Sequence, residues 1–314
     1  MKLVSYRFDG EVRGGCVVGE EVIDLNRAYK LKLQAEGKTR IEQKAEAFVP
    51  ADNVALLEGG EESLALAKEA VDFVLANRDK LPVEKVIFAR SQVKLEAPIL
   101  KPGKILCVGH NYREHIQEMG REIPKYPVLF AKFSNTIIGP EDDIPLHPVT
   151  NQLDYEAEFA FVIGKKARYV REEDALDYVA GYTIANDVSA RDLQFRTIQW
   201  LQGKTVDGSL PLGPWLVTKE DIPDPHTLEI SLKVNGEERQ RSNTKNLVFN
   251  VNRLVSYLSE ILTLEPGDLI LTGTPGGVGV ARDPKVFLQD GDVVRVEIDQ
   301  IGVLENRVRA VGRE

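Results

Sequence analysis

The chain has 314 residues, of which 43% are hydrophobic and 28% are charged, so it can bury the core of one large or two modest domains. Its formal net charge of −9 argues against nucleic acid or an anionic membrane as the main partner. No apolar run approaches the roughly 20 residues of a membrane span, and the first residues lack the apolar stretch of a signal peptide.

The first part of the chain, residues 1–95, is predicted to form a small α+β domain. An Asp9-Gly10 turn joins two predicted strands, and Gly59-Gly60 interrupts the helical region that follows. No polar cluster converges here, so we expect this part to serve packing or assembly. The predicted elements are strands at 2–8, 12–18 and 22–25, and helical segments at 26–48 and 61–77.

Two cysteines, Cys16 and Cys107, lie far apart in the sequence and among apolar neighbours. This setting predicts buried, reduced thiols, which are typical of cytoplasmic proteins. No Cys/His spacing indicates a zinc site. We therefore expect a cytoplasmic protein without disulfides.

The second part, residues 96–314, is predicted to be a strand-rich, mixed α/β domain without regular βαβ repetition. Asn235-Gly236 predicts a hairpin turn, and Ser189-x-x-Asp192 resembles a capping box at the start of a helix. The predicted strands lie at 104–109, 127–133, 153–164 and 182–185, from 268 into a glycine-rich loop, and at 292–299 and 303–310. The predicted helices lie at 110–120, 172–179 and 251–262.

Acidic residues alternate with apolar ones in the segment 153–164, as in a β-strand, so Asp154, Glu156 and Glu158 share one face. Carboxylates roughly 6–7 Å apart repel one another unless water or a cation neutralises them. A solvated strand face is one interpretation. The same face continues through apolar residues, which favours a buried strand whose acidic end opens into a cavity that holds a hard divalent cation.

The next predicted strand ends at Asn186-Asp187, and Arg191 follows Asp187 at the i+4 position, with Gln194 one turn on. Asp187 and Arg191 form either an ion pair on a helix surface or part of a site in which Asp187 is a third ligand. The second interpretation rests on the frequent use of strand ends in sites. Both stay open at this point.

His115 and Glu118 are three residues apart, on one face of the predicted helix 110–120. A carboxylate that accepts one imidazole N–H fixes the tautomer and leaves the other nitrogen as a base. A surface pair is the alternative. The loop that follows, with Pro124 and Pro127, resembles a lid, so we expect residues 110–125 to be open without ligand and to close over a substrate.

Two glycine-containing stretches resemble phosphate-binding loops, but neither matches one. Gly203-Lys204-Thr205 imitates the end of a P-loop, yet Ile198 stands where that motif requires glycine, so nucleotide binding is excluded there. The loop 273–279 lacks the dinucleotide-binding spacing. Its glycines either form a tight turn or present backbone N–H groups to an anion such as a carboxylate.

Six stretches, taken together and in this order, resemble the fumarylacetoacetate hydrolase family, over about residues 95–314. This resemblance implies a mixed, strand-rich, barrel-like catalytic domain that assembles as a homodimer. The chain is similar in size to short bacterial members with a small N-terminal domain. The stretches are GHNYREHIQEMG, PVLFAKF, LDYEAEFAFVIG, GYTIANDVSARDLQ, GKTVDG and LTGTPGGVG.

The resemblance also implies roles for individual residues. His110 stands where many relatives carry Arg or Lys, so it leaves open whether a doubly charged substrate is preferred. Asp154 has no metal role in the matching motif. The implied roles are metal ligands of Mg²⁺ or Mn²⁺ for Glu156, Glu158 and Asp187; a catalytic dyad for His115 and Glu118; enolate stabilisation for Lys204; positioning of water or a carbonyl by Gln194; support of the metal carboxylates by Arg191; and contacts near the substrate for Lys132, Arg191, Gly273 and Thr274.

The implied activity is metal-dependent chemistry on small 2-oxo acids through a metal-bound pyruvate enolate. We expect C–C bond cleavage, either acylpyruvate hydrolysis or oxaloacetate decarboxylation, with isomerisation or tautomerisation as the alternative. A non-catalytic protein that binds metal or carboxylate is an alternative of another class. The pair His115 and Glu118 distinguishes an enzyme from a protein that only binds, because a binding protein needs no base on a lid.

Overall fold

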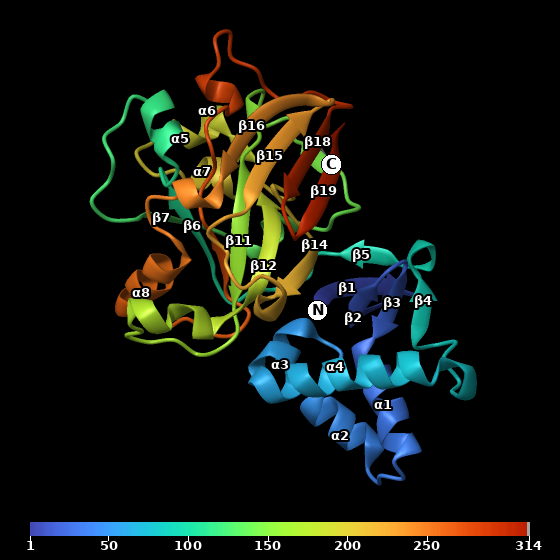
Figure 1. The fold of residues 1–314 in the computed structure, drawn as a ribbon. Helices are drawn as coiled ribbons and strands as arrows, with labels where there is room; N and C mark the ends of the chain where they lie inside the picture. The colour runs from blue at the N-terminus through green and yellow to red at the C-terminus, as the bar shows by residue number, and fades with distance from the viewer. Residues whose placement is uncertain (313–314) are drawn as a thin grey trace.

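One large mixed sheet runs through the whole molecule in the computed structural model, which describes residues 1–312 (Figure 1). In spatial order its strands are β4 (Ile87–Ala89), β3 (Glu21–Asp24), β2 (Glu11–Val18), β1 (Lys2–Phe8), β14 (Leu210–Thr218), β12 (Val179–Asn186), β11 (Ala157–Ile163), β17 (Leu269–Leu271), β6 (Ile105–Gly109) and β7 (Val128–Lys132). Two short strands join its sides, β5 (Lys94–Glu96) beside β1 and β8 (Ile137–Ile138) beside β14. Within residues 1–312 the order ends at β4 and β7, so the sheet is open and does not close into a barrel.

A second, five-stranded sheet packs across the centre of the large one, where β18 and β19 contact β12 and β14. Asn235 and Gly236 both have positive φ, 52° and 82°, which suits the tight turn of the predicted hairpin. That hairpin is therefore confirmed. The strands of this sheet are β16 (Glu237–Asn243), β15 (Glu229–Val234), β18 (Val293–Ile298), β19 (Gly302–Ala310) and β9 (Ile144–Leu146).

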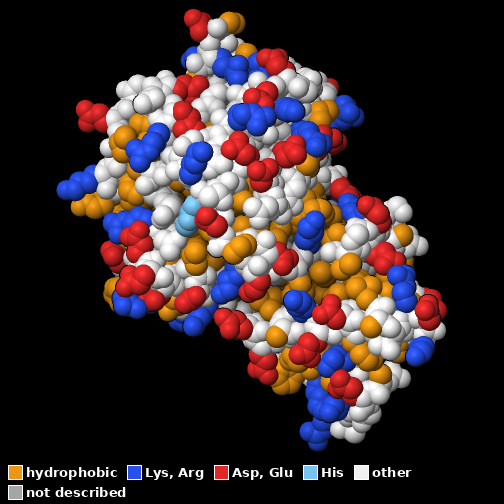
Figure 2. Space-filling view, viewed as in Figure 1, with side chains coloured by type: hydrophobic (Ala, Val, Ile, Leu, Met, Phe, Trp, Pro, Cys, Tyr) orange, Lys and Arg blue, Asp and Glu red, His pale blue; other side chains and the backbone are white. Residues whose placement is uncertain are grey.

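The N-terminal strands carry four helices: α1 (Leu25–Ala35), α2 (Ile41–Phe48), α3 (Asn53–Glu58) and α4 (Gly60–Ala76) (Figure 1). The predicted helical segment 26–48 is split in two around Gly37, whose φ is +67°. Apolar side chains of these helices share one core cluster with Val162, Leu212 and Leu271 of the central strands. Figure 2 shows hydrophobic side chains gathered where the N-terminal lobe meets the larger body. The division at residue 95 stays a prediction.

The larger body carries four short α-helices, α5 (Arg113–Glu118), α6 (Arg191–Gln194), α7 (Leu201–Lys204) and α8 (Val251–Ile261). The short helix predicted at 172–179 is present as a 3₁₀ helix, Glu172–Tyr178, but its predicted closure by Gly181 is wrong, because Gly181 lies inside β12. A Cβ at Gly181 would clash with the carbonyl oxygen of Val217 on β14. Gly181 is thus required for close strand pairing rather than for helix termination.

The predicted strand 153–164 is interrupted at Tyr155-Glu156. Its first part, β10 (Leu153–Asp154), pairs with β13 (Ser189–Ala190), whereas β11 pairs with β12. The predicted capping box at Ser189 is wrong, because the Ser189 hydroxyl donates to the carbonyl oxygen of Asp187 at 2.9 Å and the helix α6 begins at Arg191. This interruption lets neighbouring acidic residues serve different partners.

Cys16 and Cys107 are free and buried, as the sequence predicted. Across residues 1–312, no helix combines the length and the apolar character that crossing a membrane requires.

Candidate functional site

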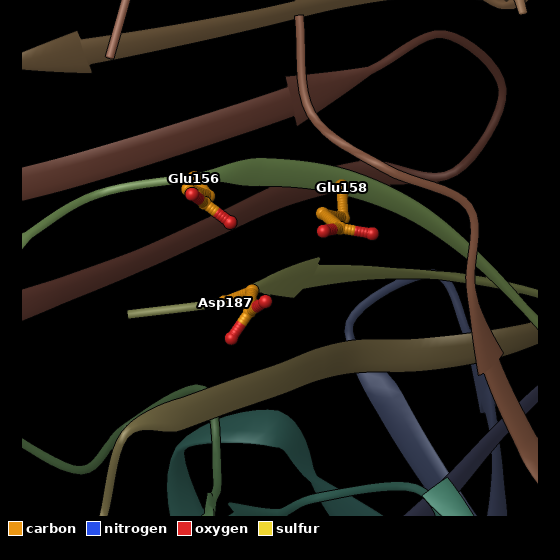
Figure 3. A group of neighbouring side chains, drawn as sticks. All are labelled: Glu156, Glu158 and Asp187. Carbon is orange, nitrogen blue, oxygen red and sulfur yellow. The ribbon is translucent and has the colours of Figure 1, made fainter. Parts of the chain in front are cut away.

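Three carboxylates from two adjacent strands form a buried cluster (Figure 3). Glu156 immediately precedes β11, Glu158 lies within β11, and Asp187 immediately follows β12. The two strands pair in a register that brings these ends together, and the Asp187 N–H donates to the Glu156 carbonyl oxygen at 2.9 Å. One oxygen of each carboxylate lies within 4.8 Å of the others. The structure therefore gathers the three predicted ligands, which we call the carboxylate triad.

Two buried lysines neutralise one side of the triad. The Lys204 ammonium on α7 lies 2.7 Å from Glu156 Oε2 and 2.7 Å from Asp187 Oδ2. The Lys132 ammonium on β7 lies 2.9 Å from Asp187 Oδ1, an ion pair whose angles fall outside those of a hydrogen bond. Burial raises the pKa of Glu156, but the nearby charges of Lys204 and Arg191 outweigh it and bring that pKa to about 2. Glu156 is therefore ionised.

Glu158 has a different environment. In the part of the chain that the structure describes, no ion pair reaches its carboxylate, and one oxygen accepts the Gly273 N–H at 2.6 Å. Burial and the charges of Asp187 and Glu156 raise its pKa well above the usual value. A divalent cation among the triad oxygens would relieve this repulsion. Oxygen donors of this kind suit Mg²⁺ or Mn²⁺, so the residues present fit the expected metal.

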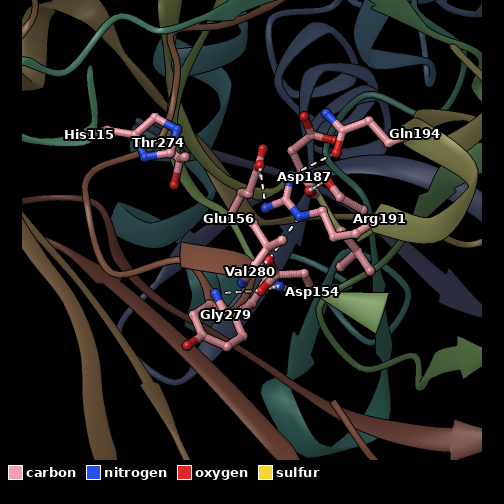
Figure 4. A network of polar contacts seen from close by, with 12 residues as sticks. His115, Asp154, Glu156, Asp187, Arg191, Gln194, Thr274, Gly279 and Val280 are labelled. Atoms are coloured by element: carbon pink, nitrogen blue, oxygen red, sulfur yellow. Dashed lines mark hydrogen bonds and ion pairs between the residues drawn. The ribbon is translucent and has the colours of Figure 1, made fainter. Parts of the chain in front are cut away.

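Arg191 connects the triad to a fourth carboxylate, Asp154 (Figure 4). Its Nε donates to Asp154 Oδ2 at 2.8 Å, and its Nη2 lies 2.7 Å from Glu156 Oε1 in an ion pair off the hydrogen-bond direction. Its Nη1 donates to Gln194 Oε1 at 2.9 Å. The surface ion pair between Asp187 and Arg191 is thus excluded, because both are buried and Arg191 turns to other partners.

Asp154 does not join the triad, so the predicted common face of three carboxylates is wrong for this residue. The break in the strand at Tyr155 turns the Asp154 side chain toward Arg191 and the glycine-rich loop. Its oxygens also accept the N–H groups of Gly279 at 2.8 Å and Val280 at 3.0 Å. Asp154 therefore holds Arg191 and the loop in place.

The glycine-rich loop presents its backbone N–H groups to carboxylates, which favours the anion-binding interpretation over a plain turn. The anions are side chains of the protein itself. A Cβ at Gly277, whose φ is +103°, would clash with the Arg239 carbonyl oxygen, so the loop requires glycine there. The Gly273 N–H donates to Glu158, and the Gly277 N–H donates to Glu118. The N–H groups of Gly279 and of the next residue, Val280, donate to Asp154.

The predicted dyad is present on α5. His115 Nδ1 lies 3.3 Å from Glu118 Oε2, and the Gly277 N–H donates to both Glu118 oxygens at 3.0 and 3.1 Å. Burial raises the pKa of Glu118, but the hydrogen bonds from His115 and Gly277 outweigh it and lower that pKa. The contact to Nδ1 leaves Nε2 of His115 for a substrate.

One cavity is lined both by His115 of the dyad and by Glu156 and Glu158 of the triad. Glu118, Lys132, Asp187 and Gly273 lie outside its lining. The predicted substrate contacts remain predictions. The polar lining comprises His110, His115, Arg121, Glu156, Glu158, Arg191, Gln194, Lys204 and Thr274, and the aromatic lining comprises Phe130, Phe195 and Trp200.

Sequence reasoning missed Arg121, which follows the end of α5 and lines the cavity. The available signal was a cation directly after Gly120, the helix stop. For His110 the sequence indicates only that this chain lacks a cation that the resemblance leads one to expect. Its ring stacks on His115 at 6.0 Å between centroids, and burial together with the charges of His115 and Arg121 lowers its pKa to about 4. A neutral imidazole therefore lines the cavity at neutral pH.

Comparison with known proteins supports this description. Oxaloacetate tautomerase Fahd2a, mitochondrial, of Rattus norvegicus is 48% identical over 261 residues, which is 83% of this chain and 80% of the relative. The structure of fumarylacetoacetate hydrolase from psychrophilic Exiguobacterium antarcticum matches with a TM-score of 0.80 and 35% identity over 99% of this chain and 100% of that chain. Maleylpyruvate hydrolase from Sphingobium sp. SYK-6, in complex with manganese(II) ion and pyruvate, matches with a TM-score of 0.73 and 28% identity over the same shares.

The family model described as fumarylacetoacetate (FAA) hydrolase C-terminal matches residues 104–309. This range contains the carboxylate triad, the dyad and the glycine-rich loop. The strand-rich, mixed α/β fold agrees with that of the similar structures. The chain therefore belongs to the fumarylacetoacetate hydrolase family.

Proposed function

We propose that this protein is a metal-dependent tautomerase that interconverts the enol and keto forms of a 2-oxo dicarboxylic acid of the oxaloacetate class. The observation that carries this proposal is a base with its orienting carboxylate, His115 and Glu118, across one cavity from a buried carboxylate triad. The identity to a rat oxaloacetate tautomerase supports the choice of reaction. The sequence alone favoured C–C bond cleavage.

Glu156, Glu158 and Asp187 would hold Mg²⁺ or Mn²⁺, and a bound divalent ion supplies Lewis-acid polarisation of the 2-oxo acid. The manganese ion in the similar maleylpyruvate hydrolase structure supports this assignment. Lys204 would keep Glu156 and Asp187 in position and present positive charge to the cavity. That charge stabilises an enolate oxygen as it develops.

Tautomerisation moves one proton between C3 and the oxygen on C2, and no other atom is gained or lost. His115 would exchange the proton at C3, because it lines the cavity and its Nδ1 is held by Glu118. General acid–base help of this kind is worth about 10²–10⁴-fold. The aromatic side chains of Phe130, Phe195 and Trp200 would limit the access of water, which this reaction does not need.

The test follows the ultraviolet absorbance of enol-oxaloacetate, with pyruvate measured in parallel. We expect the protein with Mg²⁺ or Mn²⁺ to accelerate enol loss, and a chelator to abolish the acceleration. His115→Ala should lower the rate by about 10²–10⁴-fold, whereas His226→Ala, which removes a histidine outside the cavity lining, should retain it. Metal-dependent pyruvate formation without faster tautomerisation would overturn the proposal.

C–C bond cleavage is the second candidate function, and the likeness to maleylpyruvate hydrolase favours it. There His115 would activate water against a carbonyl carbon, or oxaloacetate would lose CO₂ without water. Pyruvate released from an acylpyruvate or from oxaloacetate is the discriminating product. A homodimer and a cytoplasmic location remain predictions; the printed name of the rat relative places that protein in mitochondria.

A further inference from the structure

Three cationic side chains line the cavity, and two of them already have anionic partners. Arg191 is paired with Asp154 and Glu156, and Lys204 with Glu156 and Asp187. Arg121 differs: within residues 1–312, its guanidinium has neither an ion pair nor a side-chain hydrogen bond. Its positive charge is therefore available to an anion that enters the cavity.

The surroundings of Arg121 are polar and aromatic. Both ring nitrogens of His110 are buried without a hydrogen-bond partner among the described residues, and the ring meets Trp200 edge-on at 5.4 Å between centroids. The charge of Arg121 acts on His110 strongly enough to help lower its pKa. A cation and an unpartnered neutral N–H donor thus line the cavity, and among the described residues its lining contains no carboxylate other than Glu156 and Glu158 of the triad.

We infer that Arg121, with His110 beside it, binds the distal carboxylate of the substrate, selects dicarboxylates and suppresses decarboxylation. This inference rests on the proposed function. A guanidinium binds a carboxylate through two parallel N–H···O bonds, which fixes the orientation of the acid as well as holding it. The 2-oxo acid end would then face the triad while the far carboxylate is held at the lid.

The two reactions of oxaloacetate respond differently to such a contact. In tautomerisation the C3–H bond breaks, its electron pair forms the C2–C3 double bond, and the C2 oxygen takes up a proton. In decarboxylation the C3–C4 bond breaks, its electron pair forms the same double bond, C4 leaves as CO₂, and C3 is protonated later to give pyruvate. CO₂ carries no charge, so pairing the C4 carboxylate with Arg121 stabilises the starting state more than the transition state of cleavage. The pair thus raises the barrier to decarboxylation and spares tautomerisation.

The experiment compares wild type, Arg121→Gln, Arg121→Lys and Lys125→Gln, each loaded with Mn²⁺. Lys125 is the matched control, because it lies on the same loop but outside the cavity lining. The substrates are enol-oxaloacetate, a dicarboxylate, and enol-phenylpyruvate, a monocarboxylate. For Arg121→Gln we expect KM for oxaloacetate to rise by about 10–100-fold, KM for phenylpyruvate to stay within about twofold, and the ratio of pyruvate formed to enol consumed to rise.

Arg121→Lys should recover part of the loss, and Lys125→Gln should match wild type. Equal changes for both substrates, or an unchanged product ratio, would overturn the inference. If the wild type is no tautomerase, binding decides the matter separately: L-malate and L-lactate are both 2-hydroxy acids, and only malate has a distal carboxylate. Arg121→Gln should then weaken the binding of malate alone, and unchanged malate binding would refute the subsite.

Discussion

Glu158 is the carboxylate of the triad for which the described chain supplies no cation. Lys204, Lys132 and Arg191 serve Glu156, Asp187 and Asp154, whereas Glu158 receives one backbone N–H from Gly273. Its position between two like charges is unfavourable without a metal and favourable with one. Glu158 is thus one residue whose electrostatic repulsion a bound metal ion would remove.

We therefore predict opposite effects of Glu158→Gln on the metal-free and the metal-loaded protein. The amide keeps the shape and cannot ionise beside Glu156 and Asp187, so the melting temperature without metal should be unchanged or higher. Wild type at a metal concentration of 100 Kd should gain about 2.7 kcal/mol in unfolding free energy, and the variant should gain little. Thermal unfolding with and without MnCl₂ measures both.

Glu20→Gln in an exposed turn is the matched control and should behave like wild type. A Glu158→Gln protein that is much less stable without metal would mean that Glu158 serves the fold through its charge. An undiminished metal response would remove Glu158 from the ligand set.

At the scale of the element, the glycine-rich loop positions three side chains of the site with its backbone alone. Glu118, Asp154 and Glu158 come from three different segments and meet at this loop. A backbone N–H cannot be redirected by a side-chain rotation, so these contacts depend on the conformation of the loop backbone. A small change in that path should therefore affect the dyad and the triad together.

Gly277→Ala tests this dependence. We expect a stability loss from the φ of +103°, about 1–2 kcal/mol for a left-handed residue, together with a further loss from the clash with the Arg239 carbonyl oxygen. Activity should fall, because Glu118 loses the N–H that holds it. Denaturant unfolding and steady-state kinetics give the two readouts.

Gly236→Ala is the control, since its φ is +82° and an added Cβ there meets nothing within 4 Å. This variant should lose stability but keep its activity. If Gly277→Ala and Gly236→Ala reduce activity equally, the loop does not position the dyad through Gly277.

The sequence predicted the hairpin at Asn235, the strands that carry Glu158 and Asp187, and the proximity of the dyad, because turn chemistry and motif order determine these locally. It did not predict that Asp154 leaves the acidic face. That depends on the pairing of β10 with β13, a contact between segments far apart in the chain.

The role of Gly181 also depends on a contact between segments that are distant in the sequence. In sequence a glycine after a polar segment indicates a helix end, and only the neighbouring β14 shows that the residue is needed for close packing. For Arg121 the sequence offers only a cation after Gly120, since the role that we propose for it depends on the absence of an anionic partner. Partners are a property of the folded chain.

At the scale of the whole molecule, the N-terminal part and the larger body share one sheet and one core cluster. β1 pairs with β14, with Leu3 opposite Leu216, and both side chains are buried in the same cluster. β14 in turn pairs with β12, which ends at Asn186, directly before Asp187. The N-terminal strands are thereby connected, through continuous strand pairing, to the strands that position the triad.

We predict that the chain unfolds in a single transition and that Leu3→Ala lowers its unfolding free energy by about 2–5 kcal/mol, as expected for a buried leucine. Fluorescence of Trp200 in the cavity wall and Trp215 on β14 should report the same midpoint as circular dichroism. Guanidinium titrations of both proteins provide the measurement.

Val18→Ala, at an exposed position on the adjacent β2, should change stability little and serves as the control. Two separate transitions, of which Leu3→Ala shifts only one, would show instead that residues 1–95 fold as an independent domain.

The pairing of β11 with β12 has a consequence for the folding of the chain. Glu156, Glu158 and Asp187 meet because Ala157 lies opposite Asn186, and a slip of one residue would turn Asp187 to the other face of the sheet. A misregistered molecule therefore lacks a complete ligand set. Divalent metal added during refolding should therefore stabilise only molecules in which the two strands have the correct register, so that an ion that binds the triad would also select for correct strand alignment.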